Sequence, residues 1–313
     1  MFSRVPLTHT FNSHIIRYFS LSARCHARKV CVLKERAALR VKGPESMDFL
    51  QGLMTNDMNH LDNQGSIYSM FLNTQGRIMF DTFIVKKTES DFLIDCDQEL
   101  AGKLVKHLKM YKVRRKIDIQ IQDSDKVFAI FDDQEEPSDE EQATPNALYY
   151  KDIRCSRLGL RCIANSMDTN CETTEYLKLR YSLGIPEGGK EIPLGKCTPL
   201  EYNVEYMHGV SFHKGCYIGQ ELTARTHHTG VIRKRIMPVL LSKPLSEMNP
   251  DVLNEKGKKV GTIRGSYDNV AIGLMRLQET LNSANLIVCD EPVKIELPNW
   301  WPKSAPKNPQ NRS

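Results

Sequence analysis

The last third of the chain is a series of short apolar segments separated by proline and glycine, and this spacing constrains the fold more than any other feature. From Lys234 onward, such segments alternate with residues that favour turns. Segments this short and bounded by turn formers suit β-strands better than globular helices. Their spacing predicts a small β-barrel or β-sandwich. The predicted strands are Ile236–Leu241, Val260–Gly265, Val270–Leu277 and Val293–Leu297.

The preceding part of the chain mixes strand and helix patterns. Ile67–Leu72 and Arg77–Lys86 flank the turn residues Asn73–Gly76, and this arrangement predicts a β-hairpin. Apolar residues at helical spacing predict helices over Glu99–Tyr111 and Thr173–Leu183. The fold class indicated by these elements is α+β.

An acidic segment interrupts the pattern between residues 132 and 147. Asp132–Glu141 carries seven acids in ten residues. Because like charges repel and the apolar content is low, we expect an exposed loop there. Beyond the loop, further short strands are predicted at Leu148–Asp152, Cys155–Ser156 and Leu160–Ala164.

Composition places the chain among globular proteins with a hydrophobic core. Of 313 residues, 40% are hydrophobic and 26% are charged. No apolar run approaches the ~18 residues that a membrane helix needs, so we expect no membrane partner. The net charge of +5 equals the number of cations in residues 1–30, which contain no acid. The remainder is close to neutral, which argues against a nucleic-acid partner, because that affinity rests on neutralising phosphates.

The N-terminal segment has the composition of a mitochondrial presequence. It contains Arg and Ser but no acid, and its apolar residues between Phe11 and Phe19 can gather on one helical face. Arg17–Ser20 resembles a matrix-processing site, which predicts cleavage near Phe19. We interpret residues 1–28 as a transit peptide with a flexible N-terminus and expect the mature protein in the mitochondrial matrix. A disordered basic tail is the alternative interpretation.

The cysteines and the missing motifs exclude several classes of site. The nine cysteines are odd in number and include no C-x-x-C pair. This argues against a disulfide framework and against a local zinc or iron–sulfur ligand set. The chain also lacks the P-loop, the dinucleotide-binding fingerprint, the zincin motif and the nucleophile elbow.

One eight-residue segment carries the candidate chemistry, and its signature residues are Lys214, Gly215, Cys216, Tyr217, Gly219, Gln220 and Glu221. A helix is expected to begin near Gly219, which places Cys216 just before a helix N-terminus. Both that position and the nearby cations Lys214 and Arg225 favour a thiolate over a thiol. A buried, inert cysteine is the alternative interpretation. The candidate bases for the thiol are His213, His227 and His228.

This segment resembles the K-G-C-Y-x-G-Q-E signature of the folate-binding YgfZ-type proteins. These proteins are relatives of the T-protein, the aminomethyltransferase of the glycine cleavage system. The longer run Gly209–Arg235 is similar to that of the mitochondrial iron–sulfur cluster assembly factors of this family. The resemblance extends from Ala37 to Pro302, and its other matches are Leu50–Asp57, Phe71–Asp81, His107–Lys116, Thr198–Tyr206 and Leu297–Pro302.

The resemblance implies a T-protein-like fold of three domains around a central channel that holds tetrahydrofolate. It implies a folate-binding region over residues 29–232, made of two interleaved subdomains that carry the acidic loop 132–147. The C-terminal β-barrel would then occupy residues 233–298, and residues 299–313 would form a tail.

The resemblance also suggests which residues contact the folate. A carboxylate can accept two parallel hydrogen bonds from the pyrimidine edge of the pterin, and Glu201 matches the T-protein position with this role. The other candidates are Tyr217, Tyr202 or Phe71 for ring packing, Arg225, Arg233 or Arg235 for the anionic tail, and Lys214. The alternative interpretation is that these residues are core aromatics and solvated cations.

Asp81 is a second candidate for chemistry. By two-residue alternation it shares a strand face with the apolar residues Met79, Phe83 and Val85. A carboxylate on such a face is costly unless it is paired or functional. The T-protein has two adjacent aspartates here, one of them catalytic, whereas this chain has Phe80 before Asp81. A hydrogen-bonded structural acid at a bulge is the alternative interpretation.

Three functions compete at this point. The resemblance implies a maturation factor that binds tetrahydrofolate and supports [4Fe–4S] assembly on aconitase-type and radical-SAM enzymes, such as lipoate and biotin synthases. Its implied partners are A-type iron–sulfur scaffold proteins. Cys216 would contact a cluster transiently, exchange thiols or gate partner contact.

The second function is an aminomethyltransferase or another one-carbon transferase, in which Asp81 would supply an acid near folate N5. The third is an RNA-contact surface over Lys103–Lys116, although no stacking aromatics alternate with its cations. We favour a non-catalytic assembly factor, because Phe80 and Cys216 both stand where the T-protein has aspartate.

Overall fold

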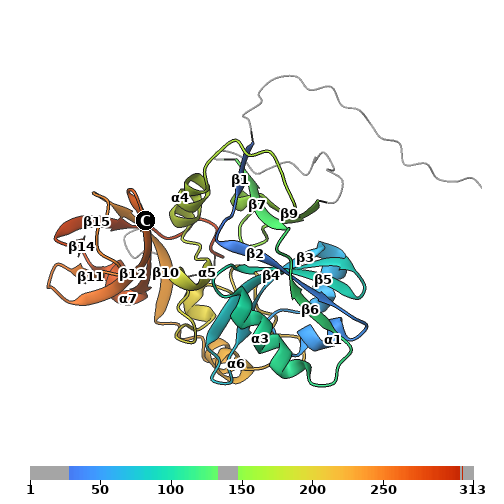
Figure 1. The fold of residues 1–313 in the computed structure, drawn as a ribbon. Coiled ribbons are helices and arrows are strands. Elements are labelled where there is room, and N and C mark those ends of the chain that lie inside the picture. Colours follow the sequence, from blue (N-terminus) through green and yellow to red (C-terminus); the bar gives the residue numbers. More distant parts are fainter. Residues whose placement is uncertain (1–27, 133–146, 304, 306–313) are drawn as a thin grey trace, which may run out of the picture.

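The structure is a computed structural model that describes residues 28–132, 147–303 and 305. Two β-sheets with their helices form the body, and a closed barrel lies beside it (Figure 1). The strands are β1 (Lys29–Val32), β2 (Arg36–Lys42), β3 (Ser66–Leu72), β4 (Ile78–Thr88), β5 (Asp91–Asp97), β6 (Asp118–Ile121), β7 (Lys126–Phe131), β8 (Leu148–Lys151), β9 (Leu160–Ala164), β10 (Lys234–Leu241), β11 (Asp251–Asn254), β12 (Lys259–Tyr267), β13 (Val270–Arg276), β14 (Leu286–Val288) and β15 (Glu291–Ile295).

The helices lie mostly in the body. The α-helices are α1 (Ser46–Gln51), α2 (Leu61–Gln64), α3 (Ala101–Lys112), α4 (Thr173–Leu183), α5 (Gly188–Glu191), α6 (Gln220–Thr229) and α7 (Leu277–Asn282), and the 3-10 helices are η1 (Met58–His60), η2 (Ser156–Leu158) and η3 (Leu200–Tyr202).

The larger body sheet has the order β3-β4-β5-β2-β6 and contains the predicted hairpin as β3 and β4. One face packs against α1 and α3 through residues such as Leu50 and Leu104, and the other packs against the second sheet through residues such as Phe83. Both faces are therefore covered, and all seven residues of β3 are buried. This is why the strand reads as a continuous apolar run rather than an alternating one.

The second body sheet has the order β1-β7-β9-β8. The predicted strand at Cys155–Ser156 is wrong, because η2 begins at Ser156. The Asp152 N–H bonds to the Gly159 carbonyl at 2.9 Å, so the chain reverses tightly between β8 and β9 and has no length for another strand. Most of the predicted acidic loop 132–147, namely residues 133–146, lies outside the described residues.

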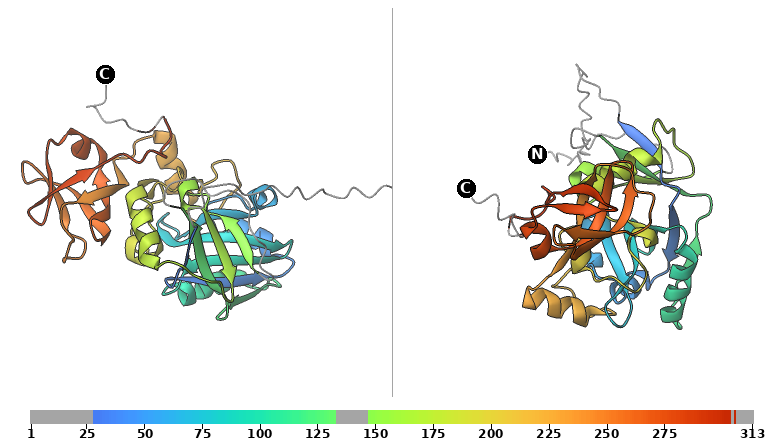
Figure 2. Two further views of the ribbon diagram at one scale, coloured as in Figure 1. Left: turned by 90° about the horizontal axis from the view of Figure 1, so that it is seen from above. Right: turned by 90° about the vertical axis from the view of Figure 1, so that its left-hand side faces the viewer.

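Helix α4 connects the body to the barrel. It spans Thr173–Leu183 as predicted, and Gly184 ends it in the left-handed conformation at φ 69°. Tyr176 and Leu179 pack into the core between the two sheets, and the helix also contacts β10, β12 and β13. The left-hand view of Figure 2 shows α4 at this junction, with the barrel beside the body.

The barrel has the order β10-β13-β12-β11-β14-β15 and is closed. Four of its strands are those predicted from the sequence, and the short β11 and β14 complete the ring. Its interior is filled by apolar side chains such as Met237, Val252 and Ile263. The described residues include no helix with the length and apolarity to cross a bilayer.

Candidate functional site

The signature segment is anchored to the body by a buried lysine. Lys214 Nζ donates to the carbonyl oxygens of Gln51, Met54 and Asn56 at 2.6, 2.8 and 2.7 Å. It also lies 5.1 Å from the ring centroid of Tyr217, which is buried too. Burial lowers the pKa of the Lys214 ammonium to about 8. Lys214 therefore fastens the loop to the end of α1, and its donors are not directed at the thiol.

A glycine at the start of α6 lets the signature segment pack against the β3–β4 turn. Gly219 has φ 78°, and a Cβ there would lie 2.3 Å from the Asn73 carbonyl oxygen. Gly76 sits opposite with φ 75°, where a Cβ would lie 2.8 Å from Leu222 Cβ. Only glycine allows both the conformation and the approach. Helix α6 begins at Gln220 as predicted, and its N-terminus is held on the hairpin.

Cys216 is exposed between these two anchors. Of the described cysteines, Cys216 and Cys289 are exposed, and the others are buried or half-buried. The predicted base His227 stacks on Phe212 with ring centroids 3.6 Å apart. Burial, His228 and His213 lower its pKa. In the part of the chain that the structure describes, no histidine hydrogen-bonds to Cys216, and no group of three or more His, Cys, Asp or Glu could hold a metal ion.

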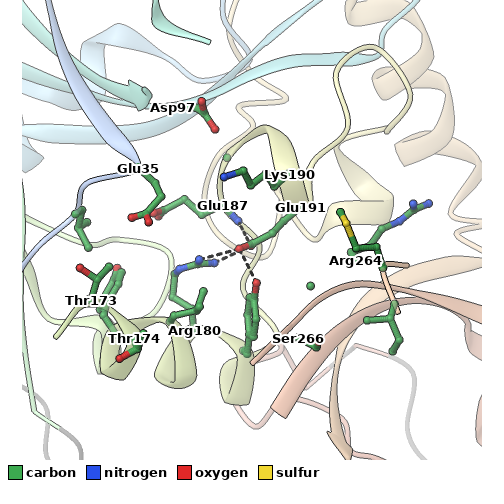
Figure 3. A pocket seen from close by; sticks show the side chains of 18 of the residues that line it. Glu35, Asp97, Thr173, Thr174, Arg180, Glu187, Lys190, Glu191, Arg264 and Ser266 are labelled. Carbon is green, nitrogen blue, oxygen red and sulfur yellow. Dashed lines mark hydrogen bonds and ion pairs between the residues drawn. The ribbon is translucent and has the colours of Figure 1, made fainter. Parts of the chain in front are cut away.

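A cavity of about 710 Å³ lies where the body meets the barrel (Figure 3). Residues of the β1–β2 connection, the end of β5 and α4 form its body side. Two barrel segments, 245–249 and 263–266, close the opposite side. Elements distant in the sequence therefore enclose one space, as a channel between domains requires.

Beside the cavity, a network of buried charges joins the two body sheets. Arg36 Nε lies 2.6 Å from Asp95 Oδ1, and Arg161 Nη1 lies 2.6 Å from Asp95 Oδ2. Arg161 Nε lies 3.1 Å from Asp152 Oδ2, and Arg161 Nη2 pairs with Glu187 Oε2. All these side chains are almost fully buried, so each charge depends on its partners for stability.

Glu187 belongs both to this network and to the cavity wall. Its Oε2 also lies 2.8 Å from Arg154 Nη1. Burial opposes ionisation of Glu187, but Arg161 and Arg154 hold the pKa of its carboxyl well below the usual range. Within the described residues, Glu187 Oε1 accepts no hydrogen bond. One oxygen of an ionised carboxylate is therefore left for a ligand.

Asp81 is part of the same network. Its Oδ2 accepts from Arg36 Nη1 at 2.9 Å, and its Oδ1 accepts from the Gly188 N–H at 3.2 Å. The prediction that Met79 shares a strand face with Asp81 and Phe83 is wrong, because β4 contains a bulge. Phe80 pairs with Phe71, whereas Ile78 pairs with Leu72. Met79 is the extra residue and packs on the opposite face of the sheet from Phe83. This geometry favours the structural interpretation of Asp81.

The structure separates the predicted folate residues from the cavity. Glu201 does not line it, and Glu201 Oε2 accepts a hydrogen bond from Thr198 Oγ1 at 2.9 Å. Tyr217 and Lys214 are buried under the signature loop, and Arg225 is exposed on α6. The signature segment and the cavity are thus two places on the molecule, although the resemblance implies that residues of the signature segment contact the folate.

The residues that do line the cavity fit a folate. Its volume lies in the ~300–1,000 Å³ range typical of small-molecule sites. Glu187 Oε1 can accept from the pyrimidine edge of a pterin. Arg264 lines the opposite side, and an arginine side chain suits the carboxylates of a glutamate tail.

Comparison with known proteins agrees with this architecture. Residues 28–132 match the family described as GCVT N-terminal domain, and residues 233–303 match that described as CAF17, C-terminal beta-barrel domain. The mitochondrial iron–sulfur cluster assembly factor IBA57 of Mus musculus is 37% identical over 306 residues, covering 87% of this chain and 85% of the relative. The IBA57 of Homo sapiens is 37% identical over 302 residues, covering 86% and 84%. The chain belongs to the IBA57 family.

The fold of this IBA57-family chain is that of the T-protein. The crystal structure of the glycine cleavage system aminomethyltransferase T from Bartonella henselae has a TM-score of 0.69 and 13% identity, and it covers 87% of this chain and 86% of that chain. At such identity the likeness concerns the fold alone, and it confirms the predicted fold class. The IBA57 relatives are named mitochondrial, which agrees with the mitochondrial part of the predicted location. The predicted transit peptide and flexible N-terminus, residues 1–28, lie outside the described residues except for residue 28.

Several residues of the cavity and network belong to no motif or periodic pattern in the sequence, namely Arg36, Asp95, Arg154, Arg161, Glu187 and Arg264. One local signal points to them. A Cβ on Gly188 would lie 2.7 Å from Asp97 Oδ2, so the Gly188–Gly189 pair marks a close approach of α5 to the end of β5. The ion pairs that Arg36 and Arg161 form with Asp81 and Asp95 join residues 45 to 66 positions apart and leave no local pattern.

Proposed function

We propose that this chain is a mitochondrial iron–sulfur cluster assembly factor in which Cys216 is the functional thiol. The observation that carries the proposal is the exposure of Cys216 within the signature segment of an IBA57-family chain. Lys214 and Tyr217 are buried on either side and hold the loop, while the thiol between them is accessible to a partner. The proposed partners are A-type scaffold proteins. The proposed recipients are aconitase-type and radical-SAM [4Fe–4S] enzymes.

The proposed role is non-catalytic. Both carboxylate oxygens of Asp81 are engaged, by Arg36 and by the Gly188 N–H, so the acid that a transferase would need is committed to the ion network. We expect no ammonia release when the protein is incubated with an aminomethylated lipoyl carrier and tetrahydrofolate. Release of ammonia would overturn the non-catalytic role and favour the transferase.

We also propose that the cavity between body and barrel binds tetrahydrofolate. Glu187 would accept from the pterin edge, and Arg264 would bind the glutamate tail. The cavity size, the free Glu187 oxygen and the position of Arg264 on the opposite wall support this assignment. When bound, tetrahydrofolate supplies a carrier for one-carbon units.

Rescue of depleted cells tests the thiol. Cys216→Ala is expected to leave aconitase activity and protein lipoylation low, whereas Cys289→Ala, at the other exposed described cysteine, is expected to restore both. Anaerobic copurification with an A-type scaffold protein should retain iron with the wild type and lose it with Cys216→Ala. Full rescue by Cys216→Ala would remove the thiol from the mechanism.

Calorimetric titration with tetrahydrofolate tests the cavity. Arg264→Met is expected to weaken binding about tenfold or more, because a charge-assisted hydrogen bond contributes roughly 1.5–3 kcal/mol. Arg114→Met changes an exposed arginine that does not line the cavity and is the matched control. Equal binding by the wild type and Arg264→Met would move the ligand away from this cavity.

A further inference from the structure

The surface of α3 and the segment after it carries an unbalanced positive charge. No acid occurs between Glu99 and Asp118. Within this interval the structure exposes most of the cations, and none of them forms an ion pair with a described residue. We call this surface the α3 basic patch, and its cations are Lys103, Lys106, Lys109, Lys112, Arg114, Arg115 and Lys116.

Helix geometry concentrates these cations on the outer side of the body. Ala101, Leu104 and Leu108 are buried against the large sheet. Lys106 and Lys109 follow Lys103 at three-residue spacing and are exposed on the other side of the helix. The right-hand view of Figure 2 shows α3 along the outer edge of the body. Like charges at this spacing repel one another, so the patch lowers the stability of the chain unless something outside it supplies negative charge.

Glu45 contacts this surface but does not neutralise the patch. Glu45 Oε2 accepts a hydrogen bond from the backbone N–H of Lys116 at 2.7 Å, rather than pairing with a cationic side chain. Arg115 lies 5.8 Å from the ring centroid of Phe49, which is a contact that leaves its charge in place.

Two apolar side chains stand exposed among these cations. Met110 is 64% exposed and Val113 is 80% exposed. Val113 ends α3 with φ 50°, a conformation that is costly for a β-branched residue. The fold thus holds two apolar side chains in solvent at the centre of a basic surface, although the same chain buries most of its large apolar residues.

We propose that the α3 basic patch docks on an anionic phospholipid bilayer, with Met110 and Val113 entering the headgroup region. Clusters of four to eight Lys and Arg are attracted to anionic lipid surfaces, and exposed apolar side chains among them add insertion energy. Such a peripheral contact needs no spanning helix, so it revises the sequence prediction of no membrane partner.

The composition of the patch disfavours other polyanions. Protein interfaces are depleted in lysine, whereas lysine supplies most cations here. Single-stranded nucleic acids require aromatic stacking platforms, but Tyr111 is half-buried and packs against His107 with ring centroids 5.1 Å apart. Insertion of apolar side chains adds to the free energy of binding to a bilayer, whereas a soluble polyanion has no apolar interior to receive them.

Cosedimentation of the full chain with vesicles tests the proposal. We expect binding to vesicles of phosphatidylcholine and phosphatidylglycerol in equal parts, no binding to phosphatidylcholine alone, and loss of binding at high salt. The double change Lys106→Glu with Lys109→Glu should weaken binding about 30-fold, at about fivefold for each cation removed. Lys87→Glu with Lys256→Glu makes the same change in net charge at exposed lysines elsewhere and should weaken it far less.

The apolar residues distinguish a bilayer from other anions. Met110→Ser with Val113→Ser should weaken vesicle binding severalfold but leave binding to heparin unchanged, whereas Met248→Ser, at another exposed methionine, should change neither. All variants keep the basic N-terminus, so differences between them report on α3. The proposal is overturned if the Lys106 and Lys109 variant binds vesicles like the wild type, or if the two serine changes have no effect on vesicle binding.

Discussion

Replacement of Lys214 by methionine tests whether the signature segment depends on a buried ammonium. Methionine keeps most of the length and apolar volume of the side chain but removes all three donors. The carbonyl oxygens of Gln51, Met54 and Asn56 would then lose the partners that they have at 2.6–2.8 Å. The substitution therefore removes the attachment of the loop and leaves its packing largely intact.

Two opposing terms set the expected magnitude. Each hydrogen bond from a charged donor contributes roughly 1.5–3 kcal/mol. Against this, burial lowers the Lys214 pKa from 10.5 to about 8, which corresponds to about 3 kcal/mol of lost hydration. The hydrogen bonds exceed the burial cost, so we expect Lys214→Met to lower the free energy of unfolding by about 3 kcal/mol.

Urea-induced unfolding at pH 7 measures this difference, and the alkylation rate of Cys216 shows whether the loop has moved. We expect a lower midpoint and faster alkylation in Lys214→Met. Lys256→Met, at an exposed lysine without an ion pair among the described residues, should change stability by less than about 0.5 kcal/mol. A Lys214→Met protein as stable as the Lys256→Met control would refute the anchoring role.

Three further predictions concern pH, the ion network and the hairpin contact. Because burial lowers the pKa of Lys214 in the folded state, the unfolded chain binds more protons above about pH 8, and the stability advantage of wild type over Lys214→Met should grow by about 1 kcal/mol between pH 7 and pH 9. Urea titrations at both pH values measure this difference, and a constant or shrinking difference would contradict the lowered pKa. Arg161→Met leaves Asp95, Asp152 and Glu187 short of a cation and should lower the free energy of unfolding by about 3–5 kcal/mol. In thermal melts the exposed control Arg233→Met should unfold at the temperature of the wild type, and equal melting of both variants would show that the network tolerates an unpaired charge. A Cβ in Gly219→Ala would lie 2.3 Å from the Asn73 oxygen, so thermal melts should show a loss of stability of more than about 2 kcal/mol, against about 1 kcal/mol for Gly230→Ala, where φ is 66° and the space is open. Similar losses for both variants would mean that the hairpin moves aside at little cost.

Local elements of the fold follow from local sequence patterns. The helix over Thr173–Leu183 has the predicted bounds, because its apolar spacing lies within one segment and Gly184 follows directly. The hairpin around Asn73–Gly76 is predicted for the same reason, since turn residues lie between two strand patterns. Four of the six barrel strands are predicted from short apolar runs bounded by proline and glycine.

The bulge at Met79 shows where such patterns stop being sufficient. Simple alternation places Met79 beside Asp81, but one extra residue in β4 moves Met79 to the opposite face. A bulge depends on how the partner strand pairs, and nothing in the sequence of β4 alone specifies that pairing. The face occupied by a side chain near a bulge is therefore decided by tertiary structure.

Local sequence patterns specify α4, the hairpin, four of the barrel strands and the start of α6 after Cys216, because each depends on residues within a few positions of one another. The packing of the sheets and the barrel brings Arg36, Asp95 and Arg161 together in the body, places Glu187 rather than Glu201 at the cavity, and leaves Cys216 apart from it. Those relations join residues that are far apart along the chain, and their positions are set when sheets and barrel pack together.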